Sequence, residues 1–484
     1  MDELGARASA LVARHPGDAR LRRVGTSRAG LPLWLLSVGH GGRQALVVAG
    51  PHANEPVGGA TALRLAERVL ADPRLSEGAD ATWHLLLCLD PDGSRRNEGW
   101  LSGPYTLGHY FRHFFRPGFM EQPEWLPDGP DGAVLPETRA LLDLQDELRP
   151  FFQCSLHGVD VGGGFVELTR DLPGLARRVA HAAARLGIPR ELGPYDTLYW
   201  PTLGPAVYRI PPPRRGDLAA AITEAAVEST WFHPHPYGTV TAVVEAPMWG
   251  VAAVQDALPP ADADGVLRTV SRTLRHDTGL LEGVLARIRP ALGAVPDAER
   301  LLAPVDDYLL VGPGLADSWD PDMNGMIDTN GANGTAVGEG AIGGGGGGGS
   351  GAGAGPGTGT GTGVTAARPL PPLDTARLTA LSISGRRVAL RTAGLLHQLA
   401  TAAGPAAAGV LPELDRLIDQ WCADYQRGRG ARWIPVARQA EFQTRVVLAA
   451  FALAGRSAPA PVHTRSRSGE RGWGSGAAVP MHLE

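Results

Sequence analysis

The chain has 484 residues, of which 43% are hydrophobic, so it is long enough for two or three domains or for one large domain with appendages. Its formal net charge of -5 shows no basic excess of the kind that binds nucleic acid or an acidic membrane surface, and we expect neither partner. The first residues lack the basic start and apolar core of a signal peptide, and no later stretch is apolar for long enough to span a membrane. We therefore expect a cytoplasmic protein.

Strand-like and helical runs alternate in the first half of the chain. LRRVGT and LPLWLLSVG flank an SRAG turn and predict a hairpin, while QALVVAG, ATWHLLLCL, FFQCSL and TVTAVVEA predict buried strands. ATALRLAERVLAD and PETRALLDLQDELRP have helical spacing. Buried strands that alternate with helices favour an α/β layered domain, with a mixed or largely parallel sheet, over residues 1–255.

The second half has a different character. Residues 256–315 are predicted to be a helical extension, and no catalytic motif is visible there. Residues 316–370 are rich in glycine and poor in large side chains, which predicts a disordered linker or insertion. Helical patterns resume over residues 371–456, and residues 457–484 are predicted to be a disordered tail. The two helical stretches either pack together or form independent modules.

An H-x-x-E pair, His52 and Glu55, follows the first buried strand in the sequence AGPHANEPVGG. Such a pair arises by chance in a chain with 14 histidines, and a polar loop would explain it equally well. Its position matters more, because open α/β sheets build their sites just beyond the carboxyl ends of strands.

Other candidate residues fall at equivalent positions. His157 follows the strand FFQCSL, Glu245 ends the strand TAVVEA, and Arg95 and Arg96 lie just beyond a third strand. Two histidines and one glutamate make a three-ligand set that leaves a position open for water, as in catalytic zinc sites. A second glutamate suits a general base, and an arginine suits stabilisation of an oxyanion.

The motifs PHANE, DPDGSRRN, PETRAL, SLHG and VVEAP resemble, in order and approximate spacing, those of the M14 zinc carboxypeptidases over about residues 10–250. The resemblance implies a mixed, largely parallel eight-stranded sheet between helices. It also implies that His52, Glu55 and His157 bind one zinc ion, and that Glu245 is the general base that activates the zinc-bound water.

The same resemblance implies roles for three neighbouring residues in DPDGSRRN. Arg95 would polarise the scissile carbonyl, since its R-x-N context resembles the arginine motif of bacterial members of the family. Arg96 and Asn97 are expected to contact the substrate.

The chain departs from the family where the substrate's carboxylate is usually held by an Asn-Arg pair. Here the nearest match is YFRHFF, in which Arg112 stands for the arginine but Phe111 replaces the asparagine. Arg116 is an alternative, or else a residue of a surface turn. Tyr237 and Tyr208 are candidates for the tyrosine that covers the substrate, although each also fits a packing role.

We therefore expect a hydrolase that cleaves an amide bond next to a free carboxylate, in a peptide or an N-acyl amino acid. One alternative is a deacylase resembling succinylglutamate desuccinylase and aspartoacylase, whose H-G-N-E motif is close to HANE. A murein peptide amidase is another. A third, of a different class, is a catalytically inactive zinc-binding protein whose helices bind partners. The sequence gives no indication of the oligomeric state.

Overall fold

The computed structural model describes residues 1–126, 134–212, 229–323 and 370–457. Most of the glycine-rich segment expected between residues 316 and 370, and the tail expected after residue 457, lie outside these ranges.

One mixed sheet organises the described residues, in the order β1-β2-β4-β3-β5-β9-β6-β8-β7, with β10 paired to β9. Its four central strands, β4, β3, β5 and β9, are parallel to one another, and antiparallel pairs flank them. The expected mixed α/β fold is confirmed. The sheet has ten strands within the described residues rather than eight, three of which are only two or three residues long. The strands are β1 (Ala19–Thr26), β2 (Pro32–Val38), β3 (Arg43–Ala49), β4 (Ala81–Leu86), β5 (Phe152–Gly162), β6 (Phe165–Leu168), β7 (Thr202–Gly204), β8 (Val207–Arg209), β9 (Val240–Gly250) and β10 (Arg432–Trp433).

Helices cover both faces of the sheet because its strands alternate apolar side chains between two cores. In β3, Ala45 and Val47 join one core and Leu46 and Val48 join the other. The first core is closed by α1 (Asp2–Arg14), α2 (Val57–Ala71), α6 (Leu175–Leu186) and α13 (Val436–Ser457). The second core is closed by α5 (Pro136–Leu148).

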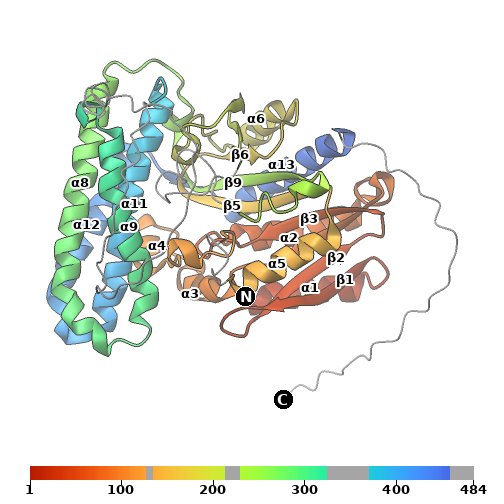
Figure 1. Ribbon diagram of the computed structural model, residues 1–484, viewed down its shortest axis with the longest axis horizontal. Helices are drawn as coiled ribbons and strands as arrows, with labels where there is room; N and C mark the ends of the chain where they lie inside the picture. Colours follow the sequence, from red (N-terminus) through yellow and green to blue (C-terminus); the bar gives the residue numbers. More distant parts are fainter. Residues whose placement is uncertain (127–133, 213–228, 324–369, 458–484) are drawn as a thin grey trace, which may run out of the picture.

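A helical bundle stands beside one end of the sheet and forms the left side of Figure 1. It consists of α8 (Ala263–Ile288), α9 (Ala298–Trp319), α11 (Thr375–Ala402) and α12 (Leu411–Ala423). The short helices α3 (Pro91–Leu101) and α4 (Leu107–His113) lie between the bundle and the sheet, and α4 packs on α11 and α12. The helices expected on either side of the glycine-rich segment therefore pack together.

After α12 the chain leaves the bundle, and the last described helix, α13, packs on the sheet. Residues 436–457 therefore share the core of the first half of the chain. Phe442 and Val447 are buried in the same core as β5 and β9. Gln443 ties the helix to the strands: its Nε2 donates to the carbonyl oxygens of His157 at 2.6 Å and of Val244 at 3.2 Å. Its Oε1 accepts the hydroxyl of Thr61 on α2 at 2.6 Å.

The register of the central strands places the expected site residues beside one another. Ala49, the last residue of β3, pairs with Leu156 of β5. The next residue of β5, His157, pairs with Glu245 of β9. β3 thus ends where its neighbour continues, and the loop after β3 lies beside His157 and Glu245. These two residues were expected to follow or end their strands, but both lie within strands of eleven residues.

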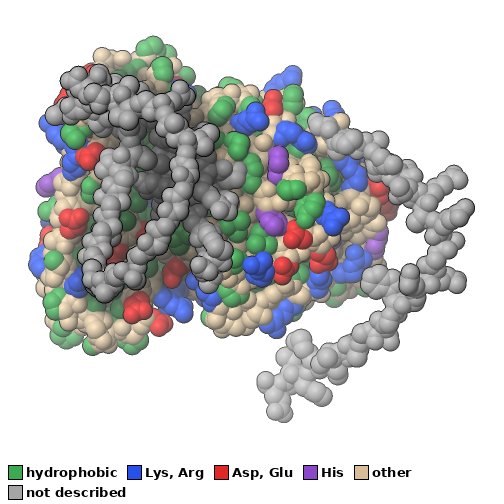
Figure 2. Space-filling view, in the orientation of Figure 1, with side chains coloured by type: hydrophobic (Ala, Val, Ile, Leu, Met, Phe, Trp, Pro, Cys, Tyr) green, Lys and Arg blue, Asp and Glu red, His purple; other side chains and the backbone are tan. Residues whose placement is uncertain are grey.

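Basic and acidic side chains are interspersed on the face of the molecule drawn in Figure 2, over both the bundle and the sheet. No helix in the described part of the chain has the length and apolar character needed to cross a membrane.

Candidate active site

The loop that carries His52 and Glu55 depends on a glycine. Gly50 has φ of +57°, in the left-handed region that favours glycine, and a Cβ there would lie 2.8 Å from Sγ of Cys88. The amide of Glu55 then donates to the carbonyl oxygen of His52 at 3.1 Å, which closes a tight turn before α2 begins at Val57.

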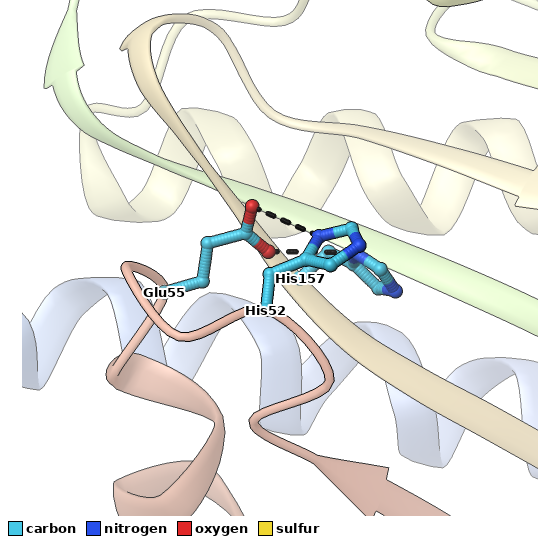
Figure 3. A group of neighbouring side chains, drawn as sticks. All are labelled: His52, Glu55 and His157. Carbon is cyan, nitrogen blue, oxygen red and sulfur yellow. Dashed lines mark hydrogen bonds and ion pairs between the residues drawn. The ribbon is translucent and has the colours of Figure 1, made fainter. Parts of the chain in front are cut away.

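The three expected metal ligands converge beside this turn. Figure 3 shows the carboxylate of Glu55 facing the rings of both His52 and His157. Nδ1 of His52 lies 3.1 Å from Oε1 of Glu55, and Nδ1 of His157 lies 3.4 Å from Oε2. All three are buried, and one ligand atom from each lies within 4.8 Å of the others. Two imidazole nitrogens and a carboxylate oxygen at this spacing fit a zinc ion.

A second buried carboxylate, that of Glu124, faces the opposite edge of both imidazole rings. Its Oε2 lies 3.0 Å from Nε2 of His157 and 3.7 Å from Nε2 of His52. Its Oε1 accepts the hydroxyl of Ser155 at 2.6 Å and the indole N–H of Trp231 at 2.7 Å. Histidines that bind metals commonly donate their other N–H to a carboxylate, which leaves the ligating nitrogen unprotonated. Sequence reasoning missed Glu124, because no pattern marks the segment around it.

The carboxylates dominate the electrostatics of this cluster. Burial alone lowers the pKa of His157, but the charges of Glu124, Glu55 and Glu245 raise that pKa well above its usual value. Burial, and then the charge of Arg116, lower the pKa of His52 to about 4. His52 is therefore a neutral imidazole near neutral pH, which is the form that binds metals.

Glu245, the expected general base, lies beside the expected metal ligands. Its Oε1 is 3.7 Å from Nδ1 of His157, and its Oε2 is buried with no hydrogen-bond partner among the described residues. The side chain keeps 13% of its exposure and lines a cavity of about 160 Å³ that also contains His52, Glu55 and His157. Burial raises the pKa of Glu245 well above its usual value, so this carboxyl group binds a proton more strongly than an exposed glutamate does.

The arginine at the metal ligands is Arg116, not Arg95. Nη1 of Arg116 donates to Oε1 of Glu55 at 2.9 Å, and Nη2 lies 3.0 Å from Nδ1 of His52. Gln122 holds the same guanidinium through its Oε1, 2.9 Å from Nη2. Arg116 is largely buried and lines the same cavity as Glu245, so the sequence-based alternative of a surface-turn residue is wrong.

Arg95 and Arg96 point away from this cavity. DPDG is not a turn after the strand: Asp90 caps α3 by accepting the amide of Gly93 at 2.9 Å, and the helix begins at Pro91. The helix directs Arg95 to Asp2 of α1, at 2.6 Å, and Arg96 to Asp297, at 3.5 Å. The roles expected for these two arginines therefore do not fit the structure.

Three further residues that were expected to contact the substrate bind other parts of the protein: Asn97, Arg112 and Tyr237. Asn97 is buried and exchanges hydrogen bonds with the backbone of Phe115. Arg112 forms ion pairs of 2.8 Å with two carboxylates of α12, those of Asp415 and Asp419. Tyr237 is 39% exposed and donates its hydroxyl to Asp146 at 2.9 Å. None of the three lines the cavity that contains the metal ligands.

Several side chains of that cavity were not anticipated from the sequence. Glu167 on β6 is buried, and burial raises its pKa to about 8, so it is mostly protonated at neutral pH. Asp196 lies in a short helical turn, Tyr195–Thr197, and Arg387 and Arg391 come from α11 in the bundle. The cavity is completed by four aromatic side chains, Phe119, Trp125, Trp200 and Trp231.

Comparison with known proteins finds a family match over the first part of the chain. Residues 6–105 match the family model of the zinc carboxypeptidases. The matched segment contains His52 and Glu55, and His157 and Glu245 lie beyond it. The match confirms the resemblance drawn from the sequence over these residues.

Three solved structures match about half of the chain at low identity. The metallo-carboxypeptidase from Burkholderia cenocepacia is 18% identical, with a TM-score of 0.34, over 53% of this chain and 61% of that chain. The carboxypeptidase A from Helicoverpa armigera is 14% identical, with a TM-score of 0.33, over 51% and 64%. The bovine thrombin-activatable fibrinolysis inhibitor, in complex with tick carboxypeptidase inhibitor, is 12% identical, with a TM-score of 0.31, over 50% and 84%. This chain thus covers less than two thirds of the first two. No curated protein is similar enough to match.

Proposed function

We propose that the protein is a zinc-dependent hydrolase that cleaves an amide bond next to a free carboxylate, as a metallocarboxypeptidase does. The observation that carries the proposal is the pairing of His157 with Glu245 across β5 and β9, beside the loop of His52 and Glu55. This pairing sets a three-donor metal group next to a carboxylate that faces a cavity. The family match over residues 6–105 supports the same class.

In this proposal His52, Glu55 and His157 hold one zinc ion. When bound, zinc supplies a Lewis acid that polarises the substrate carbonyl and makes a bound water acidic. Glu245 accepts the proton of the attacking water through its unpartnered Oε2, and returns it to the leaving amine. Arg116, rather than Arg95, donates to the oxygen that becomes negative when the carbonyl is attacked.

The test of this assignment is a Glu245→Gln variant assayed for zinc content and for hydrolysis. The variant should keep its zinc and lose activity by a factor of about 10² to 10⁴. The matched control is Glu299→Gln, on the exposed side of α9, which should leave both quantities unchanged. Hydrolysis at the wild-type rate in Glu245→Gln would remove Glu245 from the reaction.

The two arginines give a second, contrasting test. Arg116→Gln should lower kcat by a factor of about 10² to 10³, the loss usual for one donor to an oxyanion. Arg95→Gln should retain activity, since it breaks only an exposed ion pair with Asp2. An inactive Arg95→Gln together with an active Arg116→Gln would reverse the assignment.

The substrate class is tested with three kinds of compound: peptides with a free C-terminus, N-acyl amino acids and γ-linked murein peptides. We expect the peptides to be hydrolysed with the highest kcat/KM. Faster turnover of either other kind would favour the deacylase or the amidase instead.

A further inference from the structure

A groove in the helical bundle lies against a different face of α11 from the cavity that contains the expected metal ligands. α11 lines that cavity with Arg387 and Arg391, and it lines the groove with Ser382, Gly385 and Arg386. The members of each set are three or four positions apart, so each set occupies one face of the helix. The groove has a volume of about 380 Å³ and shares no residue with the cavity. It is therefore a separate candidate binding site.

Three segments that are far apart in the sequence form the walls of the groove. They are α8, α11 and a short π-helical turn, Asp424–Gly428, that follows α12. Such turns are rare in proteins and are often found at functional sites. The uncharged part of the lining is mixed and combines three apolar side chains with three hydroxyl groups: those of Val270, Leu274 and Tyr425, and those of Thr269, Thr273 and Ser382.

Four charged side chains line the groove, and their formal charges cancel: Asp277, Arg386, Asp424 and Arg429. Asp277 and Arg386 form a buried ion pair with each other. Nη2 of Arg386 is also 3.8 Å from Oδ2 of Asp424, which is too long for a hydrogen bond. The side chain of Asp424 is 55% exposed. Its carboxylate is therefore held only loosely by the protein.

Arg429 is the cation of the groove that has no carboxylate in contact with it among the described residues. The side chain is half-buried, and its Nη2 donates to the hydroxyl of Ser382. Burial lowers the pKa of Arg429, as expected for a cation that has lost water without contacting an anion. The groove therefore offers one cation, that of Arg429, and one loosely held anion, that of Asp424.

A ligand that suits both groups must carry both charges, because a lone anion or a lone cation would leave the groove with a net charge. A free α-amino acid meets this condition. Its carboxylate fits the fork of N–H donors of a guanidinium, and its ammonium group can donate to a carboxylate. A neutral side chain preserves the balance of charge.

We propose that the groove between α8 and α11 binds a free α-amino acid with a neutral side chain. Arg429 pairs with the carboxylate of the amino acid, and Asp424 pairs with its ammonium group. The side chain lies against the apolar and hydroxyl groups of the lining. This site is additional to the candidate active site and does not rest on the hydrolase activity proposed above.

The first experiment titrates L-leucine and L-threonine into the full-length protein by calorimetry, because these two side chains match the apolar and the hydroxyl parts of the lining. At least one should bind. Arg429→Gln should weaken that binding about 10- to 100-fold, the loss expected for a hydrogen bond between charged groups. Arg427→Gln, at an exposed position two residues earlier, is the matched control and should bind as the wild type does. No binding by the wild type, or equal binding by the two variants, would overturn the proposal.

Analogues of the amino acid that binds test its two charges separately. The C-terminal amide lacks the carboxylate, and the N-acetyl derivative lacks the ammonium group. Each should bind at least tenfold more weakly than the amino acid. Arg429→Gln should weaken binding of the amide less than threefold, and Asp424→Asn should weaken binding of the N-acetyl derivative less than threefold. An analogue that binds as tightly as the amino acid would overturn the proposal, since one charge would then be unused.

A second variant fills the groove without changing its charges. Thr273→Trp should weaken binding of the amino acid at least tenfold, whereas Val266→Trp, at an exposed position of the same helix, should not. Unchanged binding in Thr273→Trp would place the amino acid elsewhere.

Thermal unfolding separates loss of the site from loss of the fold. A saturating amino acid should raise the melting temperature of the wild type and of Arg427→Gln, because a ligand stabilises the folded state that binds it. It should raise the melting temperature of Arg429→Gln and of Thr273→Trp much less. An equal rise in all four proteins would refute the assignment of the groove.

Discussion

Replacing Glu124 with glutamine should weaken zinc binding about 10- to 100-fold, although Glu124 is not one of the expected metal ligands. The indole N–H of Trp231 points at Oε1 from 2.7 Å and can only donate a hydrogen bond. The glutamine must therefore keep its carbonyl oxygen there. Its NH₂ group would then face Nε2 of His157, 3.0 Å away, and Nε2 of His52, 3.7 Å away.

An NH₂ group at this position opposes the N–H of His157, which the carboxylate of Glu124 faces at 3.0 Å. To avoid the clash, His157 must carry its proton on Nδ1, which is the nitrogen that faces Glu55. A protonated nitrogen cannot bind a metal. Losing one hydrogen bond to a charged group costs about 1.5–3 kcal/mol, which corresponds to roughly 10- to 100-fold in zinc affinity.

The assay is competition for zinc between the protein and a chelator at fixed pH. Glu121→Gln is the control, because it removes the same charge three residues earlier without contacting either histidine. Wild-type zinc affinity in Glu124→Gln would refute the reasoning, since it would mean that this carboxylate does not fix the tautomers.

Three further predictions concern stability. Arg391→Met removes the cation 2.8 Å from the buried carboxylate of Asp160 and should lower the free energy of unfolding by about 3–5 kcal/mol in urea; an unchanged midpoint would contradict this. Burial raises the pKa of Glu191 to about 8, so its stabilising effect is complete below pH 4.5 and is lost as the pH rises through 8. This part of the free energy of unfolding falls by about 1.4 kcal/mol per pH unit, and the fall should be absent in Glu191→Gln. If the variant kept the same dependence of stability on pH, Glu191 would not be its cause. Phe442→Ala on α13 should cost about 3–5 kcal/mol, whereas Val436→Ala, on an exposed position of the same helix, should cost little, and equal losses would argue against a shared core.

The convergence of the expected metal ligands was predictable from sequence because it follows a general rule of sheet construction. His52 and Glu55 follow one strand, and His157 and Glu245 belong to two neighbouring strands that run in the same direction. Parallel strands bring such positions to one edge whatever the details of their ends. These residues therefore lie together even though β5 and β9 extend beyond them.

The arginines were not predictable, because their directions depend on where helices begin. A DPDG sequence favours a turn, but Asp90 caps α3 immediately, and the spacing of that helix carries Arg95 to Asp2. Arg116 and Glu124 lie where no hydrophobic period indicates which way a side chain points. Arg387 belongs to an ordinary amphipathic pattern, and only the packing of the bundle brings it to the cavity.

The contact between Gln443 and His157 has a consequence for how the protein is made. The two residues lie 286 positions apart, and Gln443 holds the backbone of the strand that carries an expected metal ligand. Chains are synthesised from the N-terminus and fold as their parts emerge from the ribosome. During synthesis the strand of His157 therefore lacks α13, the helix that covers it, until almost all of the described chain has been translated. The candidate active site is therefore complete only after the last described helix has been made.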